Sequence, residues 1–318
     1  MNEATFIDCL ESWETKGSGD VYWPDLAEKW GYDSPEILRQ AFKRERKKRG
    51  YKKEEKKVVR NSYDGVRIGI LDVETLPANV FAWGLYDQNI GINQVQKDSC
   101  LLSWAGKMLN DSTVRSDIMT PKEAIARKTK RISESVWKFV SGCDILIGHN
   151  LVGFDTKVIN TEFLVNNLPP VKYVQVDTYL VAKNNFRFLS GKMAFINEKL
   201  GIRNKIDNGG FENWKKCSEG DEEALALMLR YNIEDVFATE DLFYVLRPYI
   251  RNFNVGLYNE TNETVCPVCG SKKLVVSGYY YTSAGKYESV RCTDCNALSR
   301  RKHNLLDARK RKSLLINS

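Results

Sequence analysis

Residues 66–75 read VRIGILDVET, an apolar run that closes on two carboxylates, Asp72 and Glu74. The run predicts a buried β-strand, and side chains two residues apart on a strand point to the same face. Two neighbouring anions repel each other and resist burial, and a divalent cation relieves both penalties. Because carboxylate oxygens suit Mg²⁺ or Mn²⁺, this stretch predicts one part of a metal site. The alternative is a strand that ends in two solvated acids.

The charge of the 318-residue chain is unevenly distributed. The formal net charge is +7, of which residues 1–60 contribute +2, residues 61–255 contribute −1 and residues 256–318 contribute +6. Basic ends around a near-neutral centre are what a protein needs if it binds phosphates and holds an acidic metal site.

The composition also bears on cellular location. The sequence has no run of eighteen apolar residues, so no membrane-spanning helix is expected. The residues after Met1 lack the basic start and apolar core of a signal peptide. We therefore expect a cytoplasmic protein with no membrane partner, in the host cytosol if a phage encodes it.

Residues 1–60 are predicted to form a small helical domain that continues into a basic linker. Three short helices are expected, and Asp33-Ser34-Pro35-Glu36 starts the third. The spacing fits a helix-turn-helix that binds DNA, and it fits equally a helical cap on the main domain. The basic stretch is either a solvated linker or an arm that binds nucleic-acid phosphates. Its candidate phosphate-binding residues are Lys47, Lys48, Arg49, Lys52 and Lys53.

The centre of the chain has the pattern of an α/β domain. Thr120-Pro121-Lys122-Glu123 starts a helix, and a long helix is predicted over residues 221–249. Residues 200–220 predict a glycine-rich connection that is either disordered or faces the substrate. Further strands are expected at residues 79–86, 99–105, 112–119, 144–148 and 173–177.

Two further carboxylates lie on predicted helices of this domain. Asp155 lies near the start of a helix, where the helix dipole favours an anion. Tyr231 and Asp235 are four residues apart on the long helix and therefore share one face. These residues extend the candidate site beyond Asp72 and Glu74.

Three motifs in this order resemble those of the DEDD 3′–5′ exonucleases, the DnaQ-like branch of the ribonuclease H-like fold. They are Asp72-Val73-Glu74-Thr75, then Gly148-His149-Asn150 with Phe154-Asp155, and Tyr231-Asn232-Ile233-Glu234-Asp235. The third motif is in the tyrosine variant, which is similar to the proofreading domains of family B DNA polymerases. The histidine variant has histidine five residues before the last aspartate, where this sequence has Arg230.

The resemblance implies a mixed sheet flanked by helices over residues 64–252, and a two-metal active site. Asp72, Glu74, Asp155 and Asp235 would hold two Mg²⁺ or Mn²⁺, and Tyr231 would orient the attacking water. Asn150 and Phe154 are weaker candidates for contact with nucleic acid. The implied function is a 3′–5′ exonuclease that releases nucleoside monophosphates from DNA, most naturally from single strands or 3′ ends, in phage-like or other replication, repair or recombination.

Two other functions fit the same sequence. The same site can act on RNA or cut internally at a structured junction. A non-catalytic regulator that binds nucleic acid on a nuclease scaffold is the alternative from another class, although the complete set of four acids argues against it. The oligomeric state and the biological pathway stay open.

Two CxxC pairs near the C-terminus predict a separate metal site. Their four thiolates suit one structural Zn²⁺, and residues 260–304 resemble a zinc ribbon followed by a basic tail at 305–318. The module is expected either to grip nucleic acid or to dock a replication or repair protein. The zinc ligands would be Cys266, Cys269, Cys292 and Cys295, and the basic candidates for nucleic-acid contact are Arg300, Arg301 and Lys302.

Overall fold

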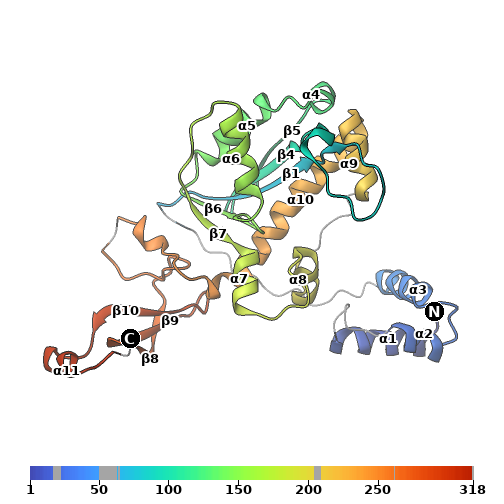
Figure 1. Ribbon diagram of the computed structural model, residues 1–318. Coiled ribbons are helices and arrows are strands. Elements are labelled where there is room, and N and C mark those ends of the chain that lie inside the picture. The colour runs from blue at the N-terminus through green and yellow to red at the C-terminus, as the bar shows by residue number, and fades with distance from the viewer. Residues whose placement is uncertain (17–22, 50–62, 64, 204–208, 261, 317–318) are drawn as a thin grey trace. The chain divides into compact units, whose positions relative to one another are not determined.

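The computed structural model describes residues 1–16, 23–49, 63, 65–203, 209–260 and 262–316 (Figure 1). The chain divides into two compact units. One unit comprises residues 1–57 and 188–205, and the other comprises residues 58–187 and 206–318. No helix within the described ranges combines the length and the apolar character needed to cross a lipid bilayer.

A five-stranded mixed sheet forms the centre of the larger unit, in the order β5-β4-β1-β6-β7. β1 pairs antiparallel with β4 and parallel with β6, β4 pairs antiparallel with β5, and β7 runs parallel to β6. The strand predicted at residues 66–75 is therefore the central strand of the sheet. The strands are β1 (Ile68–Leu76), β4 (Cys100–Met108), β5 (Val114–Ile118), β6 (Ile145–Gly148) and β7 (Val174–Asp177).

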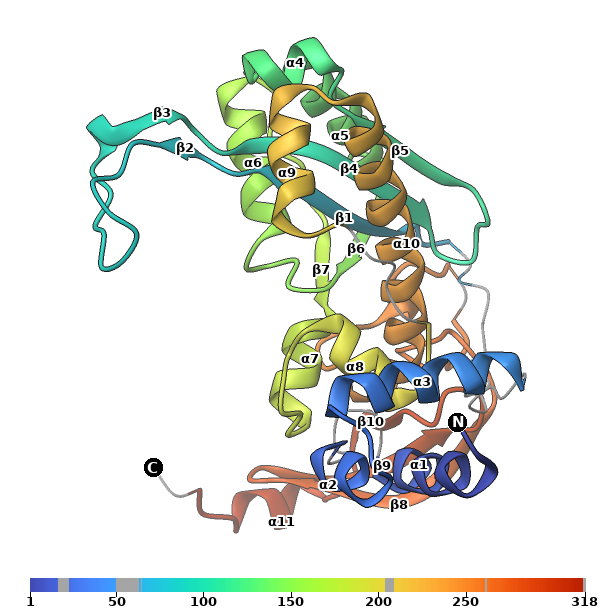
Figure 2. The same ribbon diagram turned by 90° about the vertical axis from the view of Figure 1, so that its right-hand side faces the viewer.

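Helices cover both faces of this sheet (Figures 1 and 2). On one face, Ile68 and Ile70 of β1 share a buried cluster with Val236 of α10. On the other face, Leu71 of β1 packs with Val136 of α5. This alternation places the side chains of Ile68, Ile70, Asp72 and Glu74 toward α10, up to the register shift that follows Glu74. The helices that precede the C-terminal module in this unit are α4 (Pro121–Ala126), α5 (Lys130–Val140), α6 (Asp155–Val165), α7 (Thr178–Asn185), α9 (Gly210–Glu219) and α10 (Glu222–Leu246), and the 3₁₀ turns are η1 (Ile92–Gln94), η2 (Arg247–Tyr249) and η3 (Val255–Leu257).

Two predicted segments differ from the structure. Residues 210–219 form helix α9, where the sequence suggested a glycine-rich loop; its Cys217 is buried, and Gly220 caps it with a φ of 81°. Glycines thus bound this helix instead of breaking it. The strand expected at residues 79–86 is only β2 (Asn79–Val80), paired with β3 (Val95–Lys97). The apolar residues after Val80 face solvent instead of a sheet neighbour.

The smaller unit is helical. Its core contains Phe6, Cys9, Ala27, Leu38 and Phe42. The third helix begins as predicted, because the Ser34 Oγ accepts a hydrogen bond from the Ile37 backbone N–H at 3.3 Å and a proline follows the cap. The helices are α1 (Glu3–Lys16), α2 (Trp23–Lys29), α3 (Pro35–Lys48) and α8 (Met193–Leu200).

The C-terminal part of the larger unit is an antiparallel three-stranded module in the order β10-β9-β8. It follows the α/β domain through η3, where the Val255 backbone N–H donates to the Pro267 carbonyl at 2.8 Å. The module consists of β8 (Leu274–Thr282), β9 (Gly285–Cys292) and β10 (Leu298–Asn304), followed by α11 (Ala308–Lys312).

Candidate metal centres

Three carboxylates converge where β1 meets α10. Asp72 and Glu74 each offer an oxygen from β1, Asp235 offers one from α10, and these three atoms lie within 4.8 Å of one another. Asp235 is 1% exposed, whereas Asp72 and Glu74 are half-buried. Both β1 residues lie on the strand face that packs against α10, so strand alternation alone directs them toward Asp235. Anions held this close favour a bound cation.

Asp155 lies beside this group on the first residue of α6. Its Oδ1 accepts a hydrogen bond at 3.0 Å from the backbone N–H of Val73, the residue between the two β1 carboxylates. The side chain is 2% exposed, and its place at a helix N-terminus stabilises its charge. The three atoms within 4.8 Å do not include one from Asp155. The fourth predicted acid is therefore fastened to the β1 backbone next to the other three.

Asn232 was not identified as a site residue from the sequence, yet it contacts the carboxylate cluster. Its Nδ2 donates to the Asp72 Oδ2 at 2.6 Å, and its Oδ1 accepts from the Ser103 Oγ of β4 at 3.1 Å. Both Asn232 and Ser103 are fully buried. These two hydrogen bonds, from Ser103 of β4 to Asn232 of α10 and from Asn232 to Asp72, thus fix the orientation of one Asp72 oxygen. The signal available in the sequence was only the place of this amide inside the third motif, directly after Tyr231.

The turn before α6 is organised by Asp177 at the end of β7. The Asp177 carboxylate accepts from the backbone N–H groups of Asn150 and Val152, both at 3.0 Å, and caps α7 through Tyr179 N–H at 2.9 Å. Asn150 has a left-handed φ of 67° and an exposed side chain. Its position shapes the turn that delivers Asp155. Phe154 precedes the helix with 39% of its surface exposed.

Tyr231 lies one helical turn before Asp235 on α10. It is 8% exposed and belongs to the buried cluster on the α5 side of the sheet. The ring is thus mostly packed, and its helix position keeps it near the carboxylates.

The predicted basic contacts with nucleic acid belong to other elements of the chain. Lys47 and Lys48 are exposed at the end of α3, whereas Lys52 and Lys53 fall outside the described residues. Arg49 donates to Glu45 at 2.9 Å and to Glu3 at 2.6 Å, so its guanidinium joins α3 to α1. On β10, the predicted contacts Arg300, Arg301 and Lys302 are all exposed.

The four cysteines of the C-terminal module form a second candidate metal centre. All four are buried, and their sulfurs lie within 4.8 Å of one another. The Sγ atoms of Cys266 and Cys295 are 3.6 Å apart, as are those of Cys269 and Cys292. A disulfide would bring the sulfurs to about 2.05 Å, whereas four ligands about 2.3 Å from a tetrahedral zinc ion lie about 3.8 Å apart. The geometry and the soft donors therefore fit Zn²⁺.

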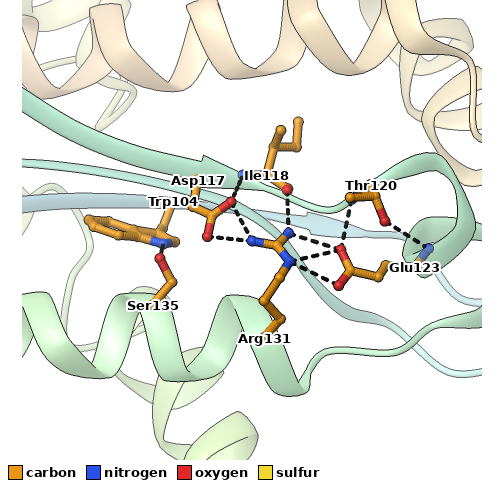
Figure 3. Close-up of polar contacts among 7 residues, drawn as sticks. All are labelled: Trp104, Asp117, Ile118, Thr120, Glu123, Arg131 and Ser135. Carbon is orange, nitrogen blue, oxygen red and sulfur yellow. Dashed lines mark hydrogen bonds and ion pairs between the residues drawn. The ribbon is translucent and has the colours of Figure 1, made fainter.

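A cavity of about 580 Å³ lies apart from both centres, between α5 and the edge of the sheet. Arg131 of α5 dominates its polar contacts: it donates to both Asp117 oxygens, at 2.8 and 2.7 Å, and to Glu123 at 2.9 Å (Figure 3). Hydrogen bonding from Arg131 lowers the pKa of Glu123 to about 2. The guanidinium is thus engaged in joining α5 to β5 and to the start of α4.

Comparison with known protein families agrees with this fold. Residues 109–247 match the RNase_H superfamily, a segment that includes Asp155, Tyr231 and Asp235 but not the β1 carboxylates. One of 95 matching chains among solved structures is the family B DNA polymerase from the hyperthermophilic archaeon Pyrobaculum calidifontis. That likeness has 17% identity and a TM-score of 0.43, and it covers 57% of this chain and 25% of the polymerase. This chain thus spans about a quarter of the polymerase's length. No curated protein matches.

Together, the sheet order and the family match confirm the predicted ribonuclease H-like α/β fold. The antiparallel C-terminal module with its cysteine cluster fits the predicted zinc ribbon. The fold supports a nuclease-type function with divalent metal ions, and the carboxylate group is compatible with such ions.

Proposed function

We propose that the protein is a two-metal-ion 3′–5′ exonuclease that hydrolyses phosphodiester bonds of DNA. The observation that carries this proposal is the convergence of Asp72, Glu74 and Asp235 within 4.8 Å, with Asp155 bonded to the backbone between the first two. Placing several carboxylates together at the centre of a sheet costs free energy, because like charges repel and resist burial. Such a cluster therefore supports a functional site.

The donor set fits magnesium or manganese. All candidate ligands are carboxylates, which are the ligands that hard divalent cations prefer. Bound ions of this kind would lower the pKa of the attacking water and offset the charge that develops on the leaving oxygen. Asn232 would hold one Asp72 oxygen in place through its 2.6 Å hydrogen bond. Asp155 would be oriented by the Val73 N–H and the dipole of α6.

Tyr231 is the candidate for orienting the attacking water. Its position one turn before Asp235 and the tyrosine variant of the third motif support this role. Tyr231→Phe removes only the hydroxyl and keeps the packed ring. We expect kcat to fall about 10- to 100-fold, the usual cost of losing an orienting group at a metal site, with little change in KM or melting temperature. An unchanged kcat would assign Tyr231 to packing alone.

Strand polarity and substrate are tested by direct digestion. A 5′-labelled single-stranded DNA and its RNA copy are incubated with the full chain in Mg²⁺ or Mn²⁺. The expected result is a ladder that shortens from the 3′ end, stronger on DNA, and nucleoside monophosphates as products. Stronger cutting of RNA, or cleavage at internal junctions, would replace the proposed substrate while keeping the site.

The site assignment is tested by Asp72→Asn, with Glu223→Gln as the matched control. Glu223 is an exposed carboxylate in the first turn of α10, the helix that carries Asp235. We expect Asp72→Asn to abolish digestion and the control to retain it. Full activity in a clean preparation of Asp72→Asn would reject the site, and no activity in the wild type would favour a non-catalytic regulator.

The zinc ribbon is proposed to assist by gripping nucleic acid. The Lys286 Nζ of β9 lies 3.7 Å from the centre of the Tyr279 ring of β8. The Arg300 guanidinium of β10 lies 4.1 Å from the centre of the Tyr287 ring of β9. Cations paired with aromatic rings suit both phosphates and bases. Arg300→Ala together with Lys286→Ala should weaken DNA binding and reduce its salt dependence; if neither changes, docking of a protein becomes the better role.

A further inference from the structure

The segment between β2 and β3 exposes an unusual number of large apolar side chains. We define residues 79–97 as the apolar arm: β2, β3 and the loop that joins them. Single exposed apolar residues are ordinary, but a concentration in one loop indicates a binding surface. The most exposed are Phe81 at 68%, Trp83 at 97%, Leu85 at 92%, Tyr86 at 84% and Ile92 at 92%.

The arm is held at both of its ends. Arg127, at the end of α4, donates from Nη2 to the Pro77 carbonyl at 3.0 Å and to the Asn79 side chain at 3.4 Å. On the other side, the Lys97 Nζ donates to the Ile125 carbonyl of α4 at 2.9 Å. The two ends are thus tied to the same short helix, so the arm leaves the domain in a defined direction.

The loop of the arm is closed by its own hydrogen bonds. The Gln94 side chain donates to the Phe81 carbonyl at 2.9 Å and accepts from the Gly91 N–H at 2.8 Å. The Phe81 N–H donates to the Gln94 carbonyl at 2.9 Å. These bonds join the two sides of the loop near Phe81 and Gln94, and the exposed rings of Trp83 and Tyr86 lie on the segment between them.

The arm begins directly after the carboxylate strand. Asn79 is five residues beyond Glu74, a separation of at most about 18 Å along the chain. In Figure 2 the arm continues from the end of β1 and extends away from the rest of the sheet. A nucleic-acid strand with its end at the carboxylates would reach the base of the arm within about five nucleotides, at ~3.4 Å per nucleotide.

The charge of the arm indicates which part of a nucleic acid it can contact. From residue 79 to residue 96 there is no lysine or arginine, and Asp87 is the single acid. Residues 79–96 thus have nothing with which to neutralise phosphates, and Lys97 at the base of the arm donates to the Ile125 carbonyl. Aromatic rings instead stack on the faces of unpaired bases, with little dependence on sequence. A stable protein interface needs about 20–30 residues on each side, more than this loop offers.

We propose that the apolar arm binds unpaired bases of the substrate strand next to the carboxylate cluster, with Trp83 and Tyr86 as the stacking residues. The inference rests on the proposed nuclease function and deepens it, because it makes a single-stranded segment of about five nucleotides the preferred substrate at the 3′ end. The arm contacts the bases, and the basic parts of the chain bind the phosphates.

Binding is measured in an Asp72→Asn background with a 5′-fluorescein-labelled, twelve-nucleotide single-stranded DNA in Mg²⁺. Adding Trp83→Ala and Tyr86→Ala should weaken binding about 10- to 100-fold or more, without changing the slope of affinity against salt, because no phosphate contact is lost. Phe211→Ala is the matched control: it removes a ring that is 72% exposed on α9, outside the arm. Trp83→Phe should restore most of the affinity.

A second DNA tests whether bases are the ligand. Abasic nucleotides within the five positions nearest the 3′ end should weaken binding to the intact arm and have no further effect on the double alanine variant. An equal loss for both proteins, or equal affinity of the variant and its control for normal DNA, would overturn the proposal. So would a wild-type dimer in sedimentation that becomes monomeric in the variant, because the arm would then serve self-association.

The outcome is separable from that of the proposed function. Hydrolysis of a p-nitrophenyl ester of thymidine 5′-monophosphate by the wild type, and its loss in Asp72→Asn, tests the carboxylates with a substrate too short to reach the arm. Hydrolysis without arm-dependent binding would reject the arm and keep the nuclease. Arm-dependent binding without hydrolysis of either substrate would reject the nuclease and keep the base contact.

Discussion

The carboxylate cluster and the cysteine cluster are two candidate metal centres built in opposite ways. Asp72 and the asparagine that bonds to it are 160 residues apart in the chain, whereas Cys266 and Cys295 are 29 residues apart. The first centre uses hard oxygen donors and is half-open to solvent; the second uses soft sulfur donors and is buried. One is assembled by the sheet and its longest helix, the other by a single hairpin.

The two centres differ in how strongly the surrounding fold depends on the metal ion. The cysteine centre belongs to a small module whose own core is largely the four thiols and a few neighbours, so its metal and its folding are expected to be coupled. The carboxylate centre sits on a domain with two large apolar clusters. We therefore expect this domain to fold without a metal ion, so that loss of the ion affects chemistry and leaves the structure intact.

The largest effect is expected at the cysteine centre. Cys292→Ser should release the zinc, because binding to such sites is worth roughly 10–16 kcal/mol and is coupled to folding. Elemental analysis of zinc and proteolysis within residues 262–304 measure the change, and Cys100→Ser, a thiol outside the cluster, is the control. An undiminished zinc content in Cys292→Ser would show that Cys292 is not a zinc ligand, and the comparison of the two metal centres would fail.

The next effect is expected at the carboxylate centre. Asp235→Asn should lower kcat/KM about 10³-fold, which is about 4 kcal/mol of transition-state stabilisation, while zinc content and melting temperature stay near those of the wild type. Kinetics on 5′-labelled DNA and a thermal melt measure both quantities. A large loss of stability would show that the carboxylate centre is structural after all.

A smaller effect tests the support of the carboxylates. Asn232→Ala should weaken Mn²⁺ binding and activity about 10- to 100-fold, the usual cost of removing a group that orients a ligand. Titration with Mn²⁺ separates metal affinity from kcat. Ser103→Ala, which keeps the 2.6 Å bond to Asp72 but removes the 3.1 Å bond that positions Asn232, should lie between Asn232→Ala and the wild type; a reversed order would contradict the proposed chain of support.

The smallest effect is expected away from both centres, at Arg131. Arg131→Ala should lower the free energy of unfolding by about 1 kcal/mol at pH 7, given the partial exposure of this network, with Lys138→Ala as a control on the same helix. Glu123 has its pKa lowered from 4.5 to about 2, so its contribution is complete above pH 4.5 and is lost as the pH falls through 2. In chemical denaturation between pH 7 and pH 2, the free energies of unfolding of the wild type and Arg131→Ala should therefore converge. A difference that stays constant over this range would exclude the Glu123 carboxylate as its source.

The elements of the fold were largely predictable where one residue pattern had one interpretation. The central strand, the capping box at Thr120 and the long helix to Leu246 follow from alternation, capping and periodicity. The failures have physical causes. Helix α9 was missed because bounding glycines mask its apolar positions, Trp214 and Cys217. The strand over residues 79–86 was overestimated because apolar content was taken as a sign of burial.

The candidate site was predictable in its residue types and not in its geometry. The domain limits, the DNA-binding role of the N-terminal helices and the individual nucleic-acid contacts stay predictions. Asn232 was quoted within a motif, yet nothing in its spacing distinguished a ligand-orienting amide from an ordinary helix residue.

By itself, the sequence determined the chemistry that the chain can offer: acids after an apolar strand, thiols in two close pairs, and rings without cations in residues 79–96. The spacing of the two CxxC pairs also indicated that the four thiols meet, because a short hairpin between the pairs brings them together. Only the tertiary structure decided that β1 and α10 bring Asp72 and Glu74 to Asp235, that Asn232 holds Asp72, and that the rings of the arm face solvent. The reason is that contacts between residues 160 apart are set by strand order and helix packing across the whole sheet, which no local pattern specifies.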